Sequence, residues 1–252
     1  MGTSSIFQGN NDKNRLLPED YVEQLQSGNS DVTWKSVKTA MSKYVSSNGS
    51  HGSPNHVIKQ AIKANGGAHR MAINSVAGMR AARNLGNFLS SVRENGLFIT
   101  FQQLGVQYNG KSSTEVFSQL INIIAPVASS KEDIVARQAS QAALSNVYEY
   151  VEENNMDFEC LDHMPIEMMD IAMKAFLSEY IWNSIIKDLE SRVEQYMEDV
   201  SSACQREEEL KDVITAVVDI EYDSNGSLIT SNVNEAVMLL TERCLGVLEG
   251  IV

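Results

Sequence analysis

The chain has 252 residues, of which 43% are hydrophobic and 21% are charged, and its net charge at pH 7 is −13. This composition is typical of a soluble globular protein with one large or two small domains. It excludes a membrane span, because polar residues and a proline interrupt the longest apolar candidate, residues 116–128. The first 30 residues are polar, which argues against a secretory signal.

The three cysteines indicate the compartment. Cys160, Cys204 and Cys244 are odd in number and widely spaced, and no Cys-x-x-Cys occurs. This usage is typical of a reducing cytosol and argues against a disulfide framework or a zinc ribbon. We therefore predict a cytoplasmic protein.

The charge is divided unevenly along the chain. Residues 1–111 carry 12 Lys/Arg and 6 Asp/Glu, whereas residues 112–252 carry 8 Lys/Arg and 27 Asp/Glu. The first part is therefore suited to an acidic surface, and the second repels nucleic acid. The simpler interpretation of the second part is that acidic helices keep the protein in solution.

Residues 1–30 are polar and without period, so we predict a flexible N-terminal arm with one anchor at Leu16-Leu17-Pro18. Residues 31–252 predict a mainly α, all-helical domain of about eight helices, with a sub-boundary near residues 105–112 between the basic and acidic parts. The first helix follows Asp31 as N-cap. Its apolar face comprises Trp34, Val37, Met41, Tyr44 and Val45, and Lys35 and Lys43 lie outside that face.

The next elements are also helical. A helix begins at Pro54 and ends at Gly66-Gly67. Residues 68–94 predict one helix rich in small residues, and residues 98–104 form a short apolar segment. Ser112 with Glu115 and Ser130 with Asp133 predict capping boxes, which begin helices through Ile124 and to about Glu153.

The last part contains the longest predicted element. Pro165 opens a helix to about Ser201, and residues 207–219 continue as helix. The turn sequence Asp223-Ser224-Asn225-Gly226 then predicts a small β-hairpin near residues 220–230, with Ile220 and Tyr222 on one strand and Leu228 and Thr230 on the other. Residues 231–250 form the final helix.

Catalytic motifs are absent from the sequence, so we predict no enzymatic activity, no catalytic residue, no metal and no bound cofactor. No zinc His-Glu-x-x-His pattern, phosphate loop, dinucleotide fingerprint or nucleophile elbow occurs. Cys160, Asp162 and His163 lie together but lack a second ligand cluster, and a loop before the Pro165 helix explains them better. The acidic run Glu207-Glu208-Glu209 is interpreted as a solvated helix face.

The N-terminus offers the strongest chemical candidate. Removal of Met1 leaves Gly2 with a free α-amine, whose pKa near 8 keeps a useful fraction neutral and nucleophilic at about pH 7. Because glycine has no side chain, this amine can enter a narrow active site. N-myristoylation is the alternative, but that motif requires Ser or Thr at the sixth position, where the chain has Ile6.

Several segments together resemble a known family. These are the opening Met1-Gly2-Thr3-Ser4-Ser5, the arm with its Leu-Leu-Pro, TWKSVKTAMSKYVSSNG at residues 33–49, GAHRMAINSVAGMRAARNLGNFL at residues 67–89, EDIVARQASQAAL at residues 132–144, and the acidic helix after Pro165. In these segments the chain resembles the QatB family of the bacterial Qat anti-phage defence system. The resemblance covers most of the chain, and its specificity lies in the first 90 residues.

The resemblance implies a chemical setting. Qat systems encode an ATPase, QatB, a QueC-like (QatC-like) enzyme and a TatD-like nuclease. A QueC enzyme activates the carboxylate of 7-carboxy-7-deazaguanine with ATP for attack by ammonia, and a QueC-like relative could accept a protein α-amine in its place. Gly2 is then the modified residue, the covalent group is a 7-deazaguanine derivative, and Gly2, Thr3, Ser4 and Ser5 are recognised by the partner enzyme.

Three hypotheses follow for the function. In the first, a non-enzymatic helical component is modified at Gly2 by the QueC-like enzyme and bridges it to other system components, including the ATPase and the nuclease. In the second, the protein is a plain helical adaptor with an unmodified N-terminal docking peptide. The third, nucleic-acid binding through residues 31–95, is disfavoured by the net acidity, so we expect neither direct nucleic-acid binding nor membrane binding.

Overall fold

The structure is a computed structural model that describes residues 32–46, 52–127, 130–186, 189, 200–225 and 233–251. Within these ranges all regular elements are helical, which confirms the predicted class, and there are ten α-helices where about eight were predicted. Their bounds are α2 Trp34–Ser46, α3 Pro54–Ala64, α4 Ala68–Asn74, α5 Val76–Asn95, α6 Leu97–Leu104, α7 Ser113–Ile124, α8 Lys131–Glu153, α9 Ile166–Ile186, α11 Val200–Asn225 and α12 Val233–Glu249, with a 3₁₀ helix η1 at Phe158–His163.

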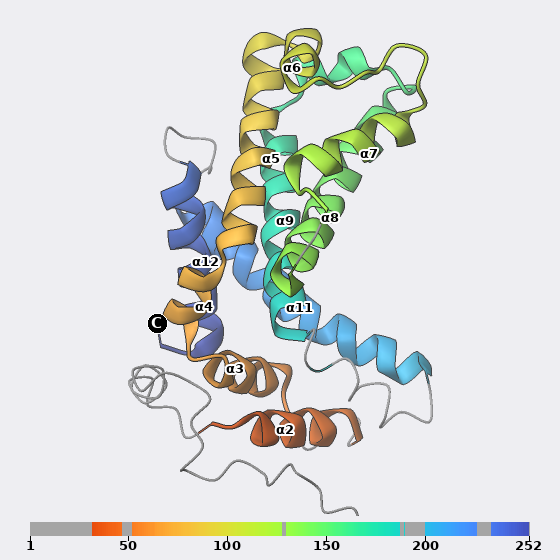
Figure 1. Ribbon diagram of the computed structural model, residues 1–252. Helices are drawn as coiled ribbons and strands as arrows, with labels where there is room; N and C mark the ends of the chain where they lie inside the picture. The colour runs from red at the N-terminus through yellow and green to blue at the C-terminus, as the bar shows by residue number, and fades with distance from the viewer. Residues whose placement is uncertain are drawn as a thin grey trace, which may run out of the picture.

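The long helices α5, α8 and α9 form the centre of the molecule (Figure 1). Helices α6 and α7 lie at one end of this centre, and α2 and α3 lie at the other (Figure 1). Helix α12 packs against α3, α4 and α5, and α11 packs against α9 and α12. One hydrophobic core runs through all of these elements, from Val37 on α2 to Leu248 on α12. None of the described helices is long and apolar enough to cross a membrane.

Local capping signals in the sequence are confirmed. The Ser112 and Ser130 side chains each accept the backbone N–H three residues ahead, and the Glu115 and Asp133 carboxylates accept from the N-cap backbone in return. Ser53 caps α3, where Pro54 occupies the first position as predicted. Asp31 lies outside the described residues.

The predicted single helix over residues 68–94 is wrong, because the structure divides it into α4 and α5 at Ser75. Ser75 is buried, has the non-helical backbone angles φ −76° and ψ 41°, and its hydroxyl donates to the Met71 carbonyl at 2.8 Å. The break exposes the first backbone N–H groups of α5, and Glu132 from α8 accepts the one of Ala77 at 2.7 Å. The sequence alone does not show this distant acceptor.

The longest predicted helix is also shorter than expected. Helix α9 ends at Ile186, Leu189 lies in a turn, and Val200 already begins α11. Most residues between them lie outside the described part. Leu189 is nevertheless fully buried.

The predicted β-hairpin near residues 220–230 is wrong for the residues that the structure describes. Ile220 and Tyr222 belong to α11, which runs to Asn225. Leu210, Ile214, Val218 and Tyr222 recur every four residues and are buried, so they continue one helical face. The Tyr222 hydroxyl donates to the Asp170 carboxylate of α9 at 2.7 Å. Tertiary burial therefore prevails over the turn sequence; Leu228 and Thr230 lie outside the described residues.

Carboxylates from the second half of the chain cap three helices of the first half. Helices α4, α5 and α6 have neither a side-chain N-cap nor an acidic residue in the first turn. Glu249 instead accepts the Ala68 N–H at 2.8 Å, Glu132 accepts the Ala77 N–H, and Asp162 accepts the Leu97 N–H. Each carboxylate pairs with a backbone group that has no partner within its own helix and faces the positive end of the helix dipole.

Gly67 has a backbone conformation that brings the start of α4 to its capping carboxylate. Gly67 precedes α4 with φ of +90°, a conformation that L side chains rarely adopt. A Cβ at this position would lie 3.5 Å from the Glu249 carboxylate. The predicted stop signal Gly66-Gly67 therefore both ends α3 and turns the chain toward the carboxylate of the last helix.

Helices α5 and α9 approach each other closely at Gly78. A Cβ on Gly78 would lie only 2.3 Å from two ring carbons of Tyr180. Tyr180 is buried and stacks on Phe176 at 6.0 Å between ring centroids. Its hydroxyl lies 3.3 Å from the Glu132 carboxylate, and burial raises the pKa of the phenol well above its ordinary value. Gly78 is thus required by the ring, not by backbone conformation.

Replacing Gly78 with Ala should lower the free energy of unfolding by about 1–3 kcal/mol, because the added methyl group must displace a ring held on all sides. Urea denaturation of both proteins measures this loss. In a double-mutant cycle, Gly78→Ala should have little effect in a Tyr180→Ala background. An equal loss in both backgrounds would show that the ring is not the cause.

Candidate functional site

The predicted site residues Gly2, Thr3, Ser4 and Ser5 lie outside the described residues. The described chain begins at residue 32, and α2 is its first element. We therefore build the site from α2, which follows the N-terminal residues in the sequence, and from α3, which packs against α2.

Helix α2 begins after Thr33, whose oxygen atoms accept hydrogen bonds from Ser36 in the first turn. The Ser36 N–H lies 3.4 Å from the Thr33 hydroxyl oxygen, and the Ser36 hydroxyl donates to the Thr33 carbonyl at 2.6 Å. The predicted apolar face is confirmed, since Val37, Met41 and Tyr44 are almost completely buried against the core. Helix α3 lies against α2 and buries Val57, Ile58, Ala61 and Ile62.

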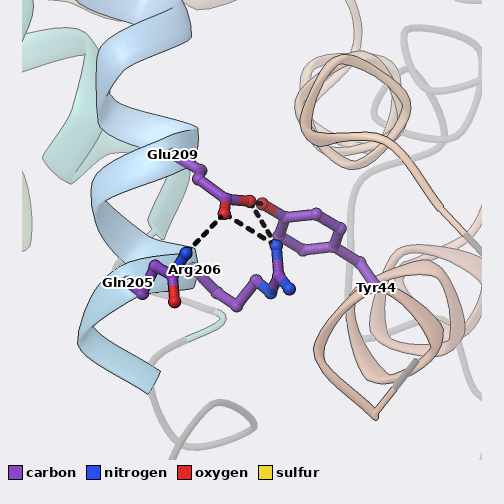
Figure 2. A network of polar contacts seen from close by, with 4 residues as sticks. All are labelled: Tyr44, Gln205, Arg206 and Glu209. Carbon is purple, nitrogen blue, oxygen red and sulfur yellow. Dashed lines mark hydrogen bonds and ion pairs between the residues drawn. The ribbon is translucent and has the colours of Figure 1, made fainter. Parts of the chain in front are cut away.

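A polar network holds α2 to α11. The Tyr44 hydroxyl donates to Glu209 Oε2 at 2.5 Å, and Arg206 Nη1 donates to both carboxylate oxygens at 2.6 and 2.7 Å (Figure 2). Gln205 Nε2 lies 3.4 Å from Glu209 Oε1. The Arg206 guanidinium also lies over the Tyr44 ring, 5.5 Å from its centroid. Both oxygens of Glu209 are therefore occupied.

The protonation states of the network are fixed by its geometry. Burial and, after it, the hydrogen bond to the Glu209 carboxylate together raise the pKa of Tyr44 to about 12. The hydrogen bonds from Tyr44 and then Arg206 lower the pKa of Glu209. At neutral pH Tyr44 is thus a neutral donor and Glu209 an anion, which suits a structural clamp and not proton transfer. The interpretation of Glu209 as a solvated helix face is wrong.

A hollow of about 530 Å³ lies on the opposite, outward side of α2. Lys35, Thr39 and Lys43 line it at intervals of four residues, and His56 of α3 lines it from the other helix. Lys35, Thr39, Lys43 and His56 are exposed. The sequence places the two lysines outside the buried face, but only the packing of α3 on α2 shows that His56 faces them.

The cluster of Cys160, Asp162 and His163 forms η1. Asp162 accepts the Leu97 N–H and is occupied as a helix cap. Burial raises the pKa of the Cys160 thiol, and Asp157 and Asp162 raise it further, which makes the thiol a poor nucleophile. Within the described residues no three His, Cys, Asp or Glu side chains gather as metal ligands. Asp162 thus has a structural role, and the segment forms a 3₁₀ helix where a loop was predicted.

Cys244 and His69 could act as a nucleophile and a base, but both side chains take part in packing or in contacts between helices. Burial raises the pKa of the Cys244 thiol to about 12, as expected for a thiol buried inside α12. His69 Nδ1 lies 2.7 Å from Glu242 Oε1 and links α4 to α12. Neither arrangement resembles an activated nucleophile with its base.

Loss of the Tyr44 hydroxyl should loosen the attachment of α2. We expect Tyr44→Phe to lower the free energy of unfolding at pH 7 by about 1 kcal/mol, because Glu209 loses one donor but keeps Arg206. The stabilisation by Tyr44 is complete below its unfolded pKa of 10.0 and is lost as the pH rises through its folded pKa of about 12.

Urea denaturation between pH 9 and 12 tests this pH dependence. Tyr44→Phe should show a weaker fall in stability over that range than the wild type, while Tyr150→Phe, outside the network, should follow the wild type. Parallel curves for Tyr44→Phe and the wild type would contradict the assignment.

Comparison with known proteins gives one match. The family model of QatB, described as the Qat anti-phage system associated protein, matches residues 66–246. The matched part contains α4 to most of α12 and the segment GAHRMAINSVAGMRAARNLGNFL, whereas Met1–Ser5, α2 and the hollow precede it. No curated protein and no solved structure matches the chain.

Proposed function

Since the chain belongs to the QatB family of Qat anti-phage system associated proteins, we propose that it is a non-enzymatic component whose Gly2 amine is modified by a partner enzyme. The partner is a QueC-like, ATP-dependent enzyme that attaches a 7-deazaguanine base. The helical body bridges this enzyme to other system components. The observation that carries the proposal is the sequence Met1-Gly2-Thr3-Ser4-Ser5 in a member of this family.

The chemistry requires a neutral, unhindered primary amine. The partner activates the carboxylate of 7-carboxy-7-deazaguanine with ATP, and the Gly2 nitrogen attacks the activated carbonyl carbon. The new C–N bond forms as the activating group leaves, and the nitrogen loses one proton. An α-amine suits this step better than a lysine, because its pKa is more than two units lower.

The described body supports a passive role. The groups whose pKa is raised most, Tyr44, Tyr180 and Cys244, are protonated and packed. Active sites instead shift the pKa of acids, bases and nucleophiles toward the working pH. The opposite charges of the two parts of the chain support bridging, because they offer complementary surfaces to different partners.

The bridging role extends to the ATPase and the TatD-like nuclease of the system. This role requires a rigid body between the surfaces that bind partners. The three carboxylates that cap helices distant in the sequence, Glu249, Glu132 and Asp162 (the distal caps), support that rigidity because they connect α4, α5 and α6 to the acidic part of the chain. The QueC-like enzyme then needs only the terminal residues.

Co-expression with the QueC-like enzyme should increase the intact mass by one molecule of 7-carboxy-7-deazaguanine less one water, and peptide mapping should place the increase on Gly2. Gly2→Ala keeps a primary amine and serves as the matched control, whereas Gly2→Pro presents a hindered secondary amine and should stay unmodified. An unchanged Gly2 peptide, with active enzyme and precursor present, would contradict the modification.

A phage-protection assay with the same variants separates modification from plain docking. We expect Gly2→Ala to retain more protection than Gly2→Pro. Full protection by unmodified Gly2→Pro would instead identify the protein as an adaptor with an unmodified docking peptide.

A further inference from the structure

Basic residues are concentrated in one continuous, acid-free segment. Residues 32–93 contain nine Lys/Arg and no Asp or Glu, although the whole chain carries −13. The segment forms α2, α3, α4 and most of α5. The segment itself is therefore positively charged within an acidic protein, although Glu249 and Glu132 reach the starts of α4 and α5, and such a charge favours anionic ligands.

Within this segment, the hollow between α2 and α3 gathers cations at one place. Lys43 follows Lys35 by eight positions on α2, so their backbones lie about 12 Å apart along the helix. Ser36 and Thr39 between them and Thr33 before them bring hydroxyl groups to the hollow, and His56 lines it from α3. Two lysines whose backbones are two helical turns apart can reach successive phosphates of a chain, whereas a single phosphate needs only one of them.

The two lysines of the hollow have no carboxylate partner among the described residues. Other lysines are paired: Lys174 lies 2.6 Å from Asp223, and Lys211 lies 2.6 Å from Glu179. Glu209 contacts α2 at Tyr44, which does not line the hollow, and its carboxylate also accepts from Arg206 of α11 (Figure 2). Among the described residues, no carboxylate therefore forms an ion pair with Lys35 or Lys43.

We propose that this hollow binds a short polyphosphate chain, such as that of a nucleoside triphosphate. The lysines bind the phosphate oxygens as point charges, and the Thr33 hydroxyl and His56 contribute hydrogen bonds. A long nucleic acid would extend beyond the hollow toward the acidic part of the protein, whose repulsion acts over about 8 Å at physiological ionic strength. A short chain remains inside the basic region. The site is independent of Gly2 modification.

Isothermal titration of the unmodified full-length protein with inorganic tripolyphosphate and with ATP, both without magnesium, tests the site. The matched variants are Lys35→Gln/Lys43→Gln and Arg83→Gln, since Arg83 is exposed on α5 outside the hollow. We expect the double variant to lose about tenfold or more in affinity for both ligands, Arg83→Gln to bind like the wild type, and salt to weaken binding. Circular dichroism checks that each variant is folded.

Tripolyphosphate and ATP separate the sources of the phosphate chain. Equal affinities show that the hollow recognises phosphates alone, and tighter ATP binding that is still lost in the double variant shows that the nucleoside adds contacts. The proposal would be overturned if neither tripolyphosphate nor ATP binds at low salt. It would also be overturned if Lys35→Gln/Lys43→Gln and Arg83→Gln lose the same affinity. Binding of a single-stranded oligonucleotide without binding of tripolyphosphate or ATP would overturn it in favour of nucleic acid. None of these results bears on Gly2.

Discussion

The fold depends on carboxylates that cap helices far away in the sequence. The segment from α2 to α6 contains one acidic residue, Glu94 near the end of α5, so the first turns of α4, α5 and α6 have no acidic side chain of their own. Glu249, Glu132 and Asp162 supply these charges from α12, α8 and η1. The uneven charge distribution along the chain is therefore not only a matter of solubility, because part of the acidic excess stabilises the basic part directly.

Local and distant interactions differ in how far the sequence predicts them. The capping boxes at Ser112 and Ser130 involve residues three apart and are readable from sequence. The cap of Ala77 spans 55 residues and that of Ala68 spans 181, so the break at Ser75 could not be predicted. The hairpin fails for the same reason, since Tyr222 is placed by Asp170 of α9 and not by its neighbours. In the candidate site, the spacing of Lys35 and Lys43 is visible in the sequence, but the position of His56 is not.

The helices that match the family and the residues that precede the match have different roles. The match over residues 66–246 covers the capped helices α4, α5 and α6 and two of the three capping carboxylates, Glu132 and Asp162. The hollow on α2 and α3 and the N-terminal residues precede the match, and the Tyr44–Arg206–Glu209 network attaches α2 to the body. A stable body that carries a chemically distinct N-terminal part is the arrangement that the proposed function requires.

Amide hydrogen exchange at Ala68, Ala77 and Leu97 tests distal capping most directly, because these N–H groups have no acceptor within their own helices. In Glu249→Ala, Glu132→Ala and Asp162→Ala, we expect exchange to accelerate about tenfold at the amide that each carboxylate caps, in keeping with a cap worth about 1 kcal/mol or more. The other two amides should be unchanged in each variant. Unchanged exchange at the capped amide, or uniform acceleration at all three, would contradict the account.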